Sequence, residues 1–282
     1  MAEYRFGGGV RVIAKLYSDA AEGFAIKAIH DALWEKGFGA GSPYRVPEPI
    51  GYLPEYGILL MHVAPGEALR EVQPRSWAGF KEGLIGAARW LAALHSWPHR
   101  VGPAADASDT VSSLERLRAE AAASRPSEAD FFEAASHELR RRYDSIREAK
   151  TRVQTHGRYH IDHVFLAPEC VTVVDMDRVG VSEAARDIGE FLHRLRWEAA
   201  RMRVGKTAMN EATAVFLAEY VRQTDSDLSS LLYHWSYSIY SMLLRSVSKP
   251  RPAGRSGDKR LRHLRREFDR VPRFLATWRR RD

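Results

Sequence analysis

A short stretch of the chain, residues 155–180, gathers side chains that can bind metals and anions. It reads THGRYHIDHVFLAPECVTVVDMDRVG and contains the carboxylates Asp162, Asp175 and Asp177. Carboxylate oxygens are the ligands that hard cations such as Mg²⁺ prefer, and His163 can bind a metal only as a neutral imidazole. Arg158 cannot accept a proton, because its guanidinium group stays charged at physiological pH. The stretch therefore gathers possible metal ligands around an arginine that cannot act as a base.

Two short strands position these side chains. HVFLAPECVTVVDM reads as a strand pair, and the apolar run VTVV delivers Asp175 at the end of the second strand. This makes Asp175 the best candidate for a metal ligand. His156, His160 and His163, together with Asp162, have a spacing that also permits a zinc site, which is the alternative for this stretch. Cys170, in the turn between the strands, has no activating base nearby in the sequence, so we expect no nucleophile there.

The first 70 residues predict a small lobe rich in strands. YRF and VRVIAKLY flank the glycines GGG at 7–9, which predicts a hairpin. A helix should start at Asp19 as its N-cap and close near Gly37. Two further strands follow, since the prolines between residues 47 and 65 exclude a helix and GILLMHV is an apolar run.

Helical periodicity dominates from Trp77 onward and predicts a second, larger lobe over 71–282. FKEGLIGAARWLAALHSW is its clearest helix, and the aromatic residues of LLYHWSYSIYSMLLR (231–245) recur at helical spacing as core residues would. We expect the segment 249–258, KPRPAGRSGD, to be a loop before a last amphipathic helix. The apolar face of that helix should comprise Leu261, Leu264, Phe268, Val271 and Leu275.

Composition and charge narrow the class of protein. The chain has 282 residues, a net charge of +7 and one cysteine, which excludes an internal disulfide and a multi-thiolate zinc site. From Arg245 onward there are 14 Lys/Arg against 4 Asp/Glu, so the tail carries +10 and the rest −3. A solvated helix face explains this better than nucleic-acid binding, which we do not expect. Without an apolar run of membrane-spanning length or a secretory signal, we expect a cytoplasmic protein with no membrane partner.

The motifs, taken in order, resemble those of the aminoglycoside phosphotransferase and choline kinase family, which has a protein-kinase-like fold. VIAK resembles its phosphate-binding lysine motif, LLMHVAPGEAL its hinge, and WLAALHSWP its Leu-x-x-Leu-His helix end. HGRYHIDHVFL resembles its catalytic loop, and VTVVDMDRVGVSEAARDIGEFL its metal-binding strand and following helix. The match covers roughly residues 4–220 and implies an α+β fold of two lobes.

The resemblance implies roles for individual residues. Lys15 would hold the phosphates of ATP, with cofactor contacts at His62 and Ala64 of the hinge. Asp31 is the first choice and Glu22 the second for the acid that pairs with Lys15. Asp175 and His163 stand at the metal positions of the family, and His156 and Asp187 would support the catalytic loop. Asp177 is either a second metal ligand or a partner of Arg178 or Arg158, and Asp162 either replaces a metal ligand or orients a hydroxyl. Arg158 is a catalytic candidate if it points at the transferred phosphate, and in a pseudokinase it pairs with Asp175, Asp177 or Asp162.

Three departures from the family pattern set the functional alternatives. Arg158 stands where the catalytic aspartate belongs, His163 stands where a metal-binding asparagine belongs, and only about fourteen residues precede Lys15, so the first strand of the small lobe is missing. One alternative is ATP-dependent phosphoryl transfer to a hydroxyl of a small molecule or peptide. The other is a pseudokinase that serves as a binding or regulatory subunit with a protein partner. A basic adaptor is a third and weaker reading, and no motif identifies the acceptor.

Overall fold

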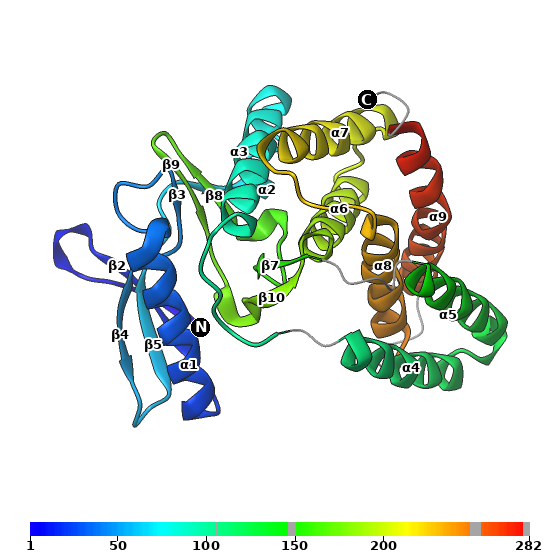
Figure 1. The fold of residues 1–282 in the computed structure, drawn as a ribbon, viewed down its shortest axis with the longest axis horizontal. Coiled ribbons are helices and arrows are strands. Elements are labelled where there is room, and N and C mark those ends of the chain that lie inside the picture. The colour runs from blue at the N-terminus through cyan, green and yellow to red at the C-terminus, as the bar shows by residue number, and fades with distance from the viewer. Residues whose placement is uncertain (105–106, 146–150, 249–254, 279–282) are drawn as a thin grey trace.

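The computed structural model describes residues 1–104, 107–145, 151–248 and 255–278. Its fold is the expected α+β arrangement of a small strand-rich lobe and a larger helical lobe (Figure 1). An antiparallel sheet of order β1-β2-β5-β4 forms the small lobe. Its strands are β1 (Ala2–Arg5), β2 (Arg11–Leu16), β4 (Pro49–Leu53) and β5 (Ile58–His62), and helix α1 (Ala20–Leu33) packs beside them.

The predicted turn chemistry of the small lobe is confirmed. β1 and β2 form a hairpin around Gly7–Gly9, where Gly8 and Gly9 have φ values of 74° and 79° that favour glycine. Helix α1 begins after Asp19, whose carboxylate accepts a hydrogen bond of 2.8 Å from the backbone N–H of Ala21. A wider helical turn over Trp34–Phe38 then ends the helix, with Gly37 at φ 142°.

A second sheet connects the two lobes. Its order is β3-β9-β8-β6, with strands β3 (Tyr44–Arg45), β6 (Glu67–Ala68), β8 (Val164–Ala167) and β9 (Cys170–Val173). β8 and β9 are the predicted strand pair, and β3 pairs with β9 in parallel. The short pair β7 (Arg152–Thr155) and β10 (Gly180–Glu183), which flanks the catalytic loop, was not predicted. The strands of this sheet come from both sides of residue 70 in the sequence. The predicted lobe boundary at residue 70 therefore stays a prediction.

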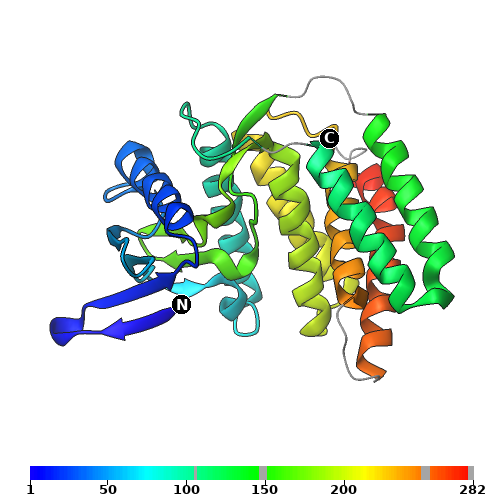
Figure 2. The ribbon, with the colours of Figure 1, turned by 90° about the horizontal axis from the view of Figure 1, so that it is seen from below.

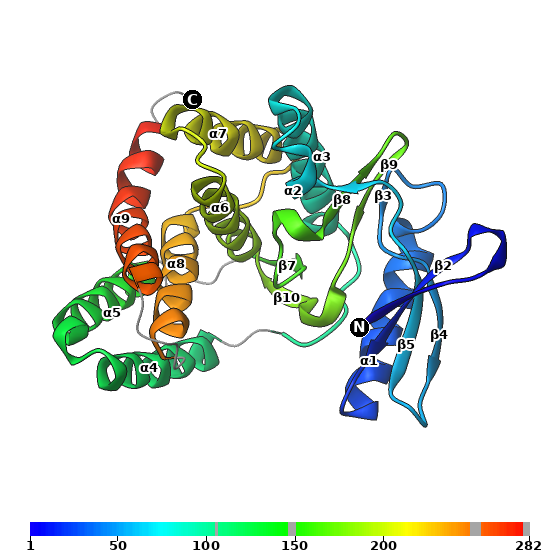
Figure 3. The ribbon, with the colours of Figure 1, turned by 180° about the vertical axis from the view of Figure 1, so that it is seen from behind.

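Helix α8 lies at the centre of the helical lobe, among α4, α6 and α9 (Figures 2 and 3). The helices are α2 (Leu69–Val72), α3 (Trp77–His95), α4 (Ala107–Ser124), α5 (Ala129–Asp144), α6 (Ala184–Arg201), α7 (Lys206–Gln223), α8 (Leu231–Ser248) and α9 (Arg255–Trp278). A Cβ on Gly189 of α6 would lie 2.6 Å from the backbone N of Trp235, so α6 and α8 approach closely because residue 189 is glycine. None of the described helices is long and apolar enough to cross a membrane.

The last helix confirms its predicted apolar face and corrects its start. All five predicted positions are buried: Leu261, Leu264, Phe268, Val271 and Leu275. The helix begins at Arg255, so the loop predicted to run to residue 258 ends earlier; residues 249–254 lie outside the described residues. Packing of the apolar face against α8 extends the helix past its glycine, which propensity alone would not favour.

Two buried histidines predict acid sensitivity. Burial lowers the pKa of His30 and of His193 to about 4. Since an unfolded histidine titrates near 6.5, the unfolded chain binds more protons between pH 6.5 and 4, and the free energy of unfolding should fall as the pH decreases through that window. Each histidine contributes up to about 3 kcal/mol by pH 4.

Urea unfolding at pH 7, 6 and 5 measures this slope. His193→Gln should make the slope shallower than in the wild type, even if it lowers stability at pH 7. His137→Gln is the matched control, because the side chain of His137 is 73% exposed. Equal slopes for the wild type and His193→Gln would contradict the assignment.

Candidate active site

An ion cluster joins the two lobes. Lys15 lies on β2 of the small lobe, and its Nζ is 2.7 Å from Oδ1 of Asp175 and 2.6 Å from Oδ2 of Asp177. The hydroxyl of Tyr17 donates a hydrogen bond of 2.8 Å to the other oxygen of Asp177. The three charged side chains are only 19–27% exposed, so water screens them weakly. One cation from the small lobe thus neutralises part of the charge of two carboxylates from the large lobe.

The backbone at Asp175 is unusual for a residue with a side chain. Asp175 follows β9 and has φ 70° and ψ 61°, in the left-handed region. This conformation costs an L-residue about 1–2 kcal/mol, and aspartate is among the side chains that tolerate it best. Burial alone would raise the pKa of Asp175, but the hydrogen bond and charge of Lys15 hold that pKa below its usual value. Asp175 is therefore an ionised carboxylate presented at a sharp turn.

The catalytic loop is held by one buried carboxylate, as the sequence predicted for Asp187. Its two oxygens accept hydrogen bonds of 2.7 Å from the backbone N–H groups of His156 and Gly157, and His95 Nε2 lies 3.2 Å away. Burial would raise the pKa of Asp187, but the hydrogen bonds from His95 and His156 outweigh it and keep the pKa low. Gly157 has φ 77°, and a Cβ there would lie 2.0 Å from the carbonyl oxygen of Arg178.

Arg158 follows this anchored turn, at the position where the resemblance implies a base. Its Nη1 is 3.5 Å from Oδ2 of Asp175, and the side chain is 53% exposed. The guanidinium therefore lies on the solvent side of the ion cluster, next to the carboxylate that would hold a metal.

His163 presents an unprotonated nitrogen to the same carboxylate. Burial lowers the pKa of His163 to about 3, so the ring is neutral near pH 7. Its Nδ1 is 3.1 Å from the carbonyl oxygen of Arg158, which can only accept, so Nδ1 carries the proton. Nε2 then directs its lone pair at Oδ2 of Asp175, 3.4 Å away. Two acceptors that face each other in this way favour a cation between them.

Asp162 lies apart from the ion cluster. It belongs to the 3-10 turn Ile161–His163, and its contacts are with Arg70 Nη1 at 3.0 Å and His160 Nδ1 at 3.5 Å. The Arg70 contact lacks hydrogen-bond alignment, so it is an ion pair only. Burial lowers the pKa of His160 to about 2, which leaves that ring neutral. A catalytic role for Asp162 stays a prediction, and its contacts direct it toward α2.

The expected partner of Lys15 was wrong. Asp31 pairs with Lys27, one turn earlier on α1, at 2.5 Å, and Lys15 pairs with Asp175 and Asp177 in place of Asp31 or Glu22. The i, i+4 spacing on α1 gives Asp31 a nearer cation, and the large lobe supplies two carboxylates within reach of Lys15. The neighbouring His30 is the buried residue of α1 whose pKa both Lys15 and Asp177 affect. In the sequence, His30 lies four residues after Ile26 and three before Leu33, and this helical spacing would have placed it on the buried face of α1.

Of the two hinge candidates, His62 is the last residue of β5 and Ala64 lies in the link between β5 and β6. The backbone N–H of His62 donates a hydrogen bond of 2.9 Å to the carbonyl oxygen of Glu48, and its side chain is 44% exposed. Ala64 is buried at 8% exposure. Both residues therefore border the junction of the lobes, and their contact with a nucleotide stays a prediction.

Within the described part of the chain, no three His, Cys, Asp or Glu side chains gather as a metal site. The histidines at 156, 160 and 163 therefore do not form the alternative zinc site. Mg²⁺ commonly binds one or two carboxylates and takes its remaining ligands from water and substrate phosphates. The pair Asp175 and Asp177 fits that pattern, and a metal contact of His163 stays a prediction.

A two-lobed fold of this kind, with a lysine of the small lobe facing aspartates of the large one, defines a kinase-like phosphotransferase. The phosphotransferase enzyme family matches residues 2–222, and the chain belongs to that family. No curated protein sequence matches the chain.

Solved structures share the fold at low sequence identity. Choline kinase LicA from Streptococcus pneumoniae is 12% identical, with a TM-score of 0.61 over 95% of this chain and 93% of that one. Amicoumacin kinase hAmiN, in complex with AMP-PNP, Ca²⁺ and Ami, is 14% identical, with a TM-score of 0.64 over 94% and 84%. Aminoglycoside-3'-phosphotransferase of type VIII is 19% identical, with a TM-score of 0.55 over 85% and 87%.

The anchor of the catalytic loop gives a stability prediction. Asp187→Asn should lower the free energy of unfolding by about 3–5 kcal/mol, because an amide can accept only one of the two backbone hydrogen bonds and no longer pairs with His95. Denaturant unfolding at pH 7 measures it.

Glu211→Gln is the control, since Glu211 makes an exposed ion pair with Lys81 and its loss should change stability little. An Asp187→Asn variant as stable as Glu211→Gln would contradict the anchoring role.

Proposed function

We propose that this chain binds ATP with Mg²⁺ between its lobes and transfers the terminal phosphoryl group to a hydroxyl of a small molecule. The observation that carries the proposal is the convergence of Lys15, Asp175 and Asp177 across the lobe junction. Phosphoryl transfer needs a cation for the phosphates and carboxylates for the metal, and these three side chains supply both.

The donor set fits the proposed ligands. Asp175 and Asp177 offer the oxygen donors that Mg²⁺ prefers, and they leave the remaining positions of the metal to water and phosphate oxygens. When bound, the nucleotide supplies the phosphoryl group and the metal neutralises its charge. Lys15 would then exchange its two carboxylates for phosphate oxygens, which conserves the charge balance of the site.

Arg158 takes a different role from the missing base. Because it cannot accept the hydroxyl proton, its contribution is to orient and stabilise negative charge on the transferred group. Its position beside Asp175, with an exposed side chain, supports this role. Since the transition state of phosphoryl transfer is loose, positioning and electrostatics supply most of the rate, and transfer without a base is slower but feasible.

One observation favours a second function, that of a pseudokinase. The contact of Arg158 with Asp175 adds to that of Lys15, so two cations already compete with a metal for one carboxylate. A protein with this site would bind a ligand or protein partner and transfer phosphate poorly.

The similar structures include a choline kinase and a glucosamine kinase. Choline and protonated glucosamine both carry a positive charge. That charge makes them reference acceptors for the tests of this chain.

Metal-dependent nucleotide binding tests the ligands that the proposed phosphotransferase requires. Asp175→Ala should abolish Mg²⁺-dependent ATP binding in calorimetry, because it removes the carboxylate between Lys15 and His163. Asp31→Ala is the matched control and should bind as the wild type does, since Asp31 pairs with Lys27. Loss of binding in Asp31→Ala with retention in Asp175→Ala would refute the assignment.

Turnover of Arg158→Asp separates the two functions. If the chain is a phosphotransferase that uses the arginine, this change should lower ATP consumption at least tenfold, about 1.4 kcal/mol in activation free energy. If the chain is a pseudokinase, the restored aspartate should create or raise slow ATP hydrolysis. Equal rates in the wild type and the variant would refute both roles of Arg158.

A further inference from the structure

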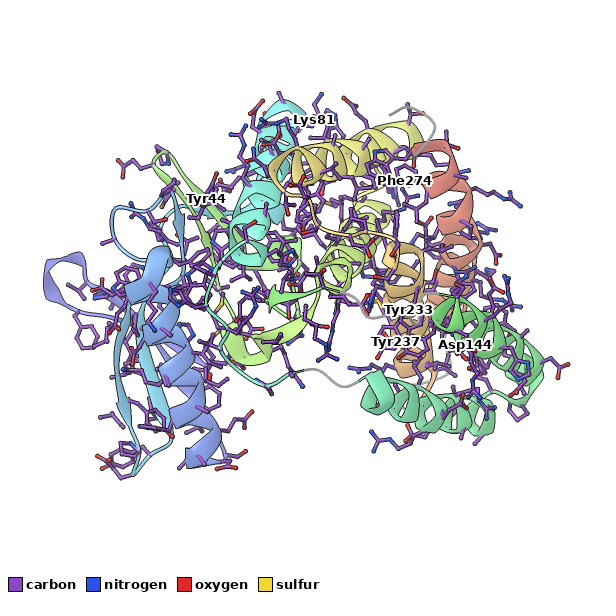
Figure 4. All side chains as sticks on the ribbon, in the orientation of Figure 1. Tyr44, Lys81, Asp144, Tyr233, Tyr237 and Phe274 are labelled. Carbon is purple, nitrogen blue, oxygen red and sulfur yellow. The ribbon has the colours of Figure 1, made fainter. Side chains whose placement is uncertain are left out.

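A cavity rich in arginine adjoins the catalytic loop. It has a volume of about 490 Å³, and its wall includes Arg158 of the loop and Arg178 of the 3-10 turn Met176–Arg178. Helix α6 contributes Arg186, Glu190 and Arg194 at intervals of four residues, and α8 contributes Arg245. Tyr237 of α8, labelled in Figure 4, lies in the same wall with the hydroxyls of three serines. The volume is within the range of small-molecule sites.

The positive charge of this arginine pocket is largely uncompensated. Glu190, its one lining carboxylate, is already engaged by Arg194 Nε at 2.9 Å and by the hydroxyl of Ser238. Burial would raise the pKa of Glu190, but Arg194 outweighs it and keeps the carboxyl ionised. Arg178, Arg186 and Arg245 form no ion pair with any residue that the structure describes.

Arg186 and Arg245 line the pocket together with the phenol of Tyr237. Burial raises its pKa, and the charges of Arg186 and Arg245 act in the opposite direction. The two guanidinium groups belong to one pocket, although they come from different helices. Like charges that share a pocket repel each other, and an anion relieves that repulsion.

We infer that the arginine pocket binds an anionic acceptor, a small molecule with a phosphate or carboxylate group and a free hydroxyl. That the bound molecule is a phosphoryl acceptor rests on the proposed function. That it is an anion rests on the residues of the pocket alone. Guanidinium groups bind both kinds of anion through paired N–H donors, and the serine hydroxyls add further hydrogen bonds.

The position of Arg158 connects the pocket to the proposed chemistry. Arg158 lines the pocket and its Nη1 lies 3.5 Å from Oδ2 of Asp175, so a molecule in the pocket that also contacts Arg158 lies next to the ion cluster. In the transfer, the acceptor's hydroxyl oxygen forms a bond to the terminal phosphorus of ATP. The bond from that phosphorus to the bridging oxygen breaks, ADP leaves with the electron pair, and the hydroxyl proton passes to water.

A larger cavity of about 630 Å³ does not compete as the acceptor site. It is lined by α6, α7 and α9, around Phe274 in Figure 4, and includes none of the residues of the ion cluster or the catalytic loop. Two of its arginines, Arg196 and Arg270, are paired with Glu267. Arg273 of this cavity therefore provides a control variant from outside the arginine pocket.

Calorimetry and thermal unfolding of the full chain without nucleotide test the anion. The probes are glucose 6-phosphate and citrate, with glucose as the neutral probe and choline and glucosamine as cationic ones. We expect at least one anion to bind with a Kd of about 1 mM or lower and to raise the Tm, with no effect of the neutral and cationic probes. Glucose 6-phosphate and citrate separate a phosphate site from a carboxylate site.

The double variant Arg186→Gln/Arg245→Gln should weaken anion binding at least tenfold, while Arg273→Gln binds as the wild type does. The double variant should also unfold no earlier than the wild type without anion, because it removes unpaired like charges. Preference for choline or glucosamine, or anion binding that the double variant leaves unchanged, would overturn the inference.

Phosphoryl transfer is assayed separately with the same probes. Anion binding without transfer to any hydroxyl would reject the proposed function and keep the anion site. Transfer to glucosamine but not to glucose 6-phosphate would keep the function and reject the anionic acceptor.

Discussion

The pairing of one lysine with two aspartates ties the small lobe to the large lobe and determines which ligands can enter between them. Lys15 reaches from the small lobe to Asp175 and Asp177 of the large lobe, at 2.6–2.7 Å and with limited exposure to water. Carboxylates in such a place need a cation, whether an ammonium group or a metal. A ligand that brings a metal and phosphates can replace the contacts between Lys15 and the aspartates, because the metal pairs with the aspartates and the phosphates pair with Lys15. A ligand without a metal and phosphates cannot replace these contacts.

The backbone of the loop around Gly157 is held by contacts that do not depend on the side chain of residue 158. Asp187 fixes the backbone of His156 and Gly157, and the close approach of Gly157 to Arg178 leaves no room for a Cβ. The next residue thus occupies a defined position whatever its type. Arg158 occupies that position, and its guanidinium group cannot accept a proton but carries a fixed positive charge. This charge adds to those of the other arginines that line the adjoining pocket.

Sequence patterns predicted the fold and the residues that local motifs position. Lys15 on its strand, Asp175 at a strand end and Asp187 at the start of a helix were found in this way, and the apolar face of the last helix was correct at every position. The partner of Lys15 was wrong because it is set by how the lobes meet, which no local pattern records. The pair β7 and β10 was missed since each strand has four residues. The arginine pocket was not predicted, because its residues come from four separate elements. The helical spacing of Arg186, Glu190 and Arg194 was the part of it visible in the sequence.

The sheet shared by the lobes has a mechanical consequence. Through β3 and β9 the segment that follows α1 is hydrogen-bonded to the strand that carries Asp175 at its end, so the lobes cannot slide past each other without breaking backbone hydrogen bonds. Rotation about the line of this sheet remains open to them. Such a rotation changes the separation of Lys15 from the aspartates most and that of β3 from β9 least. The distance between Lys15 and the two aspartates is then set by the angle between the lobes, while the shared sheet stays intact.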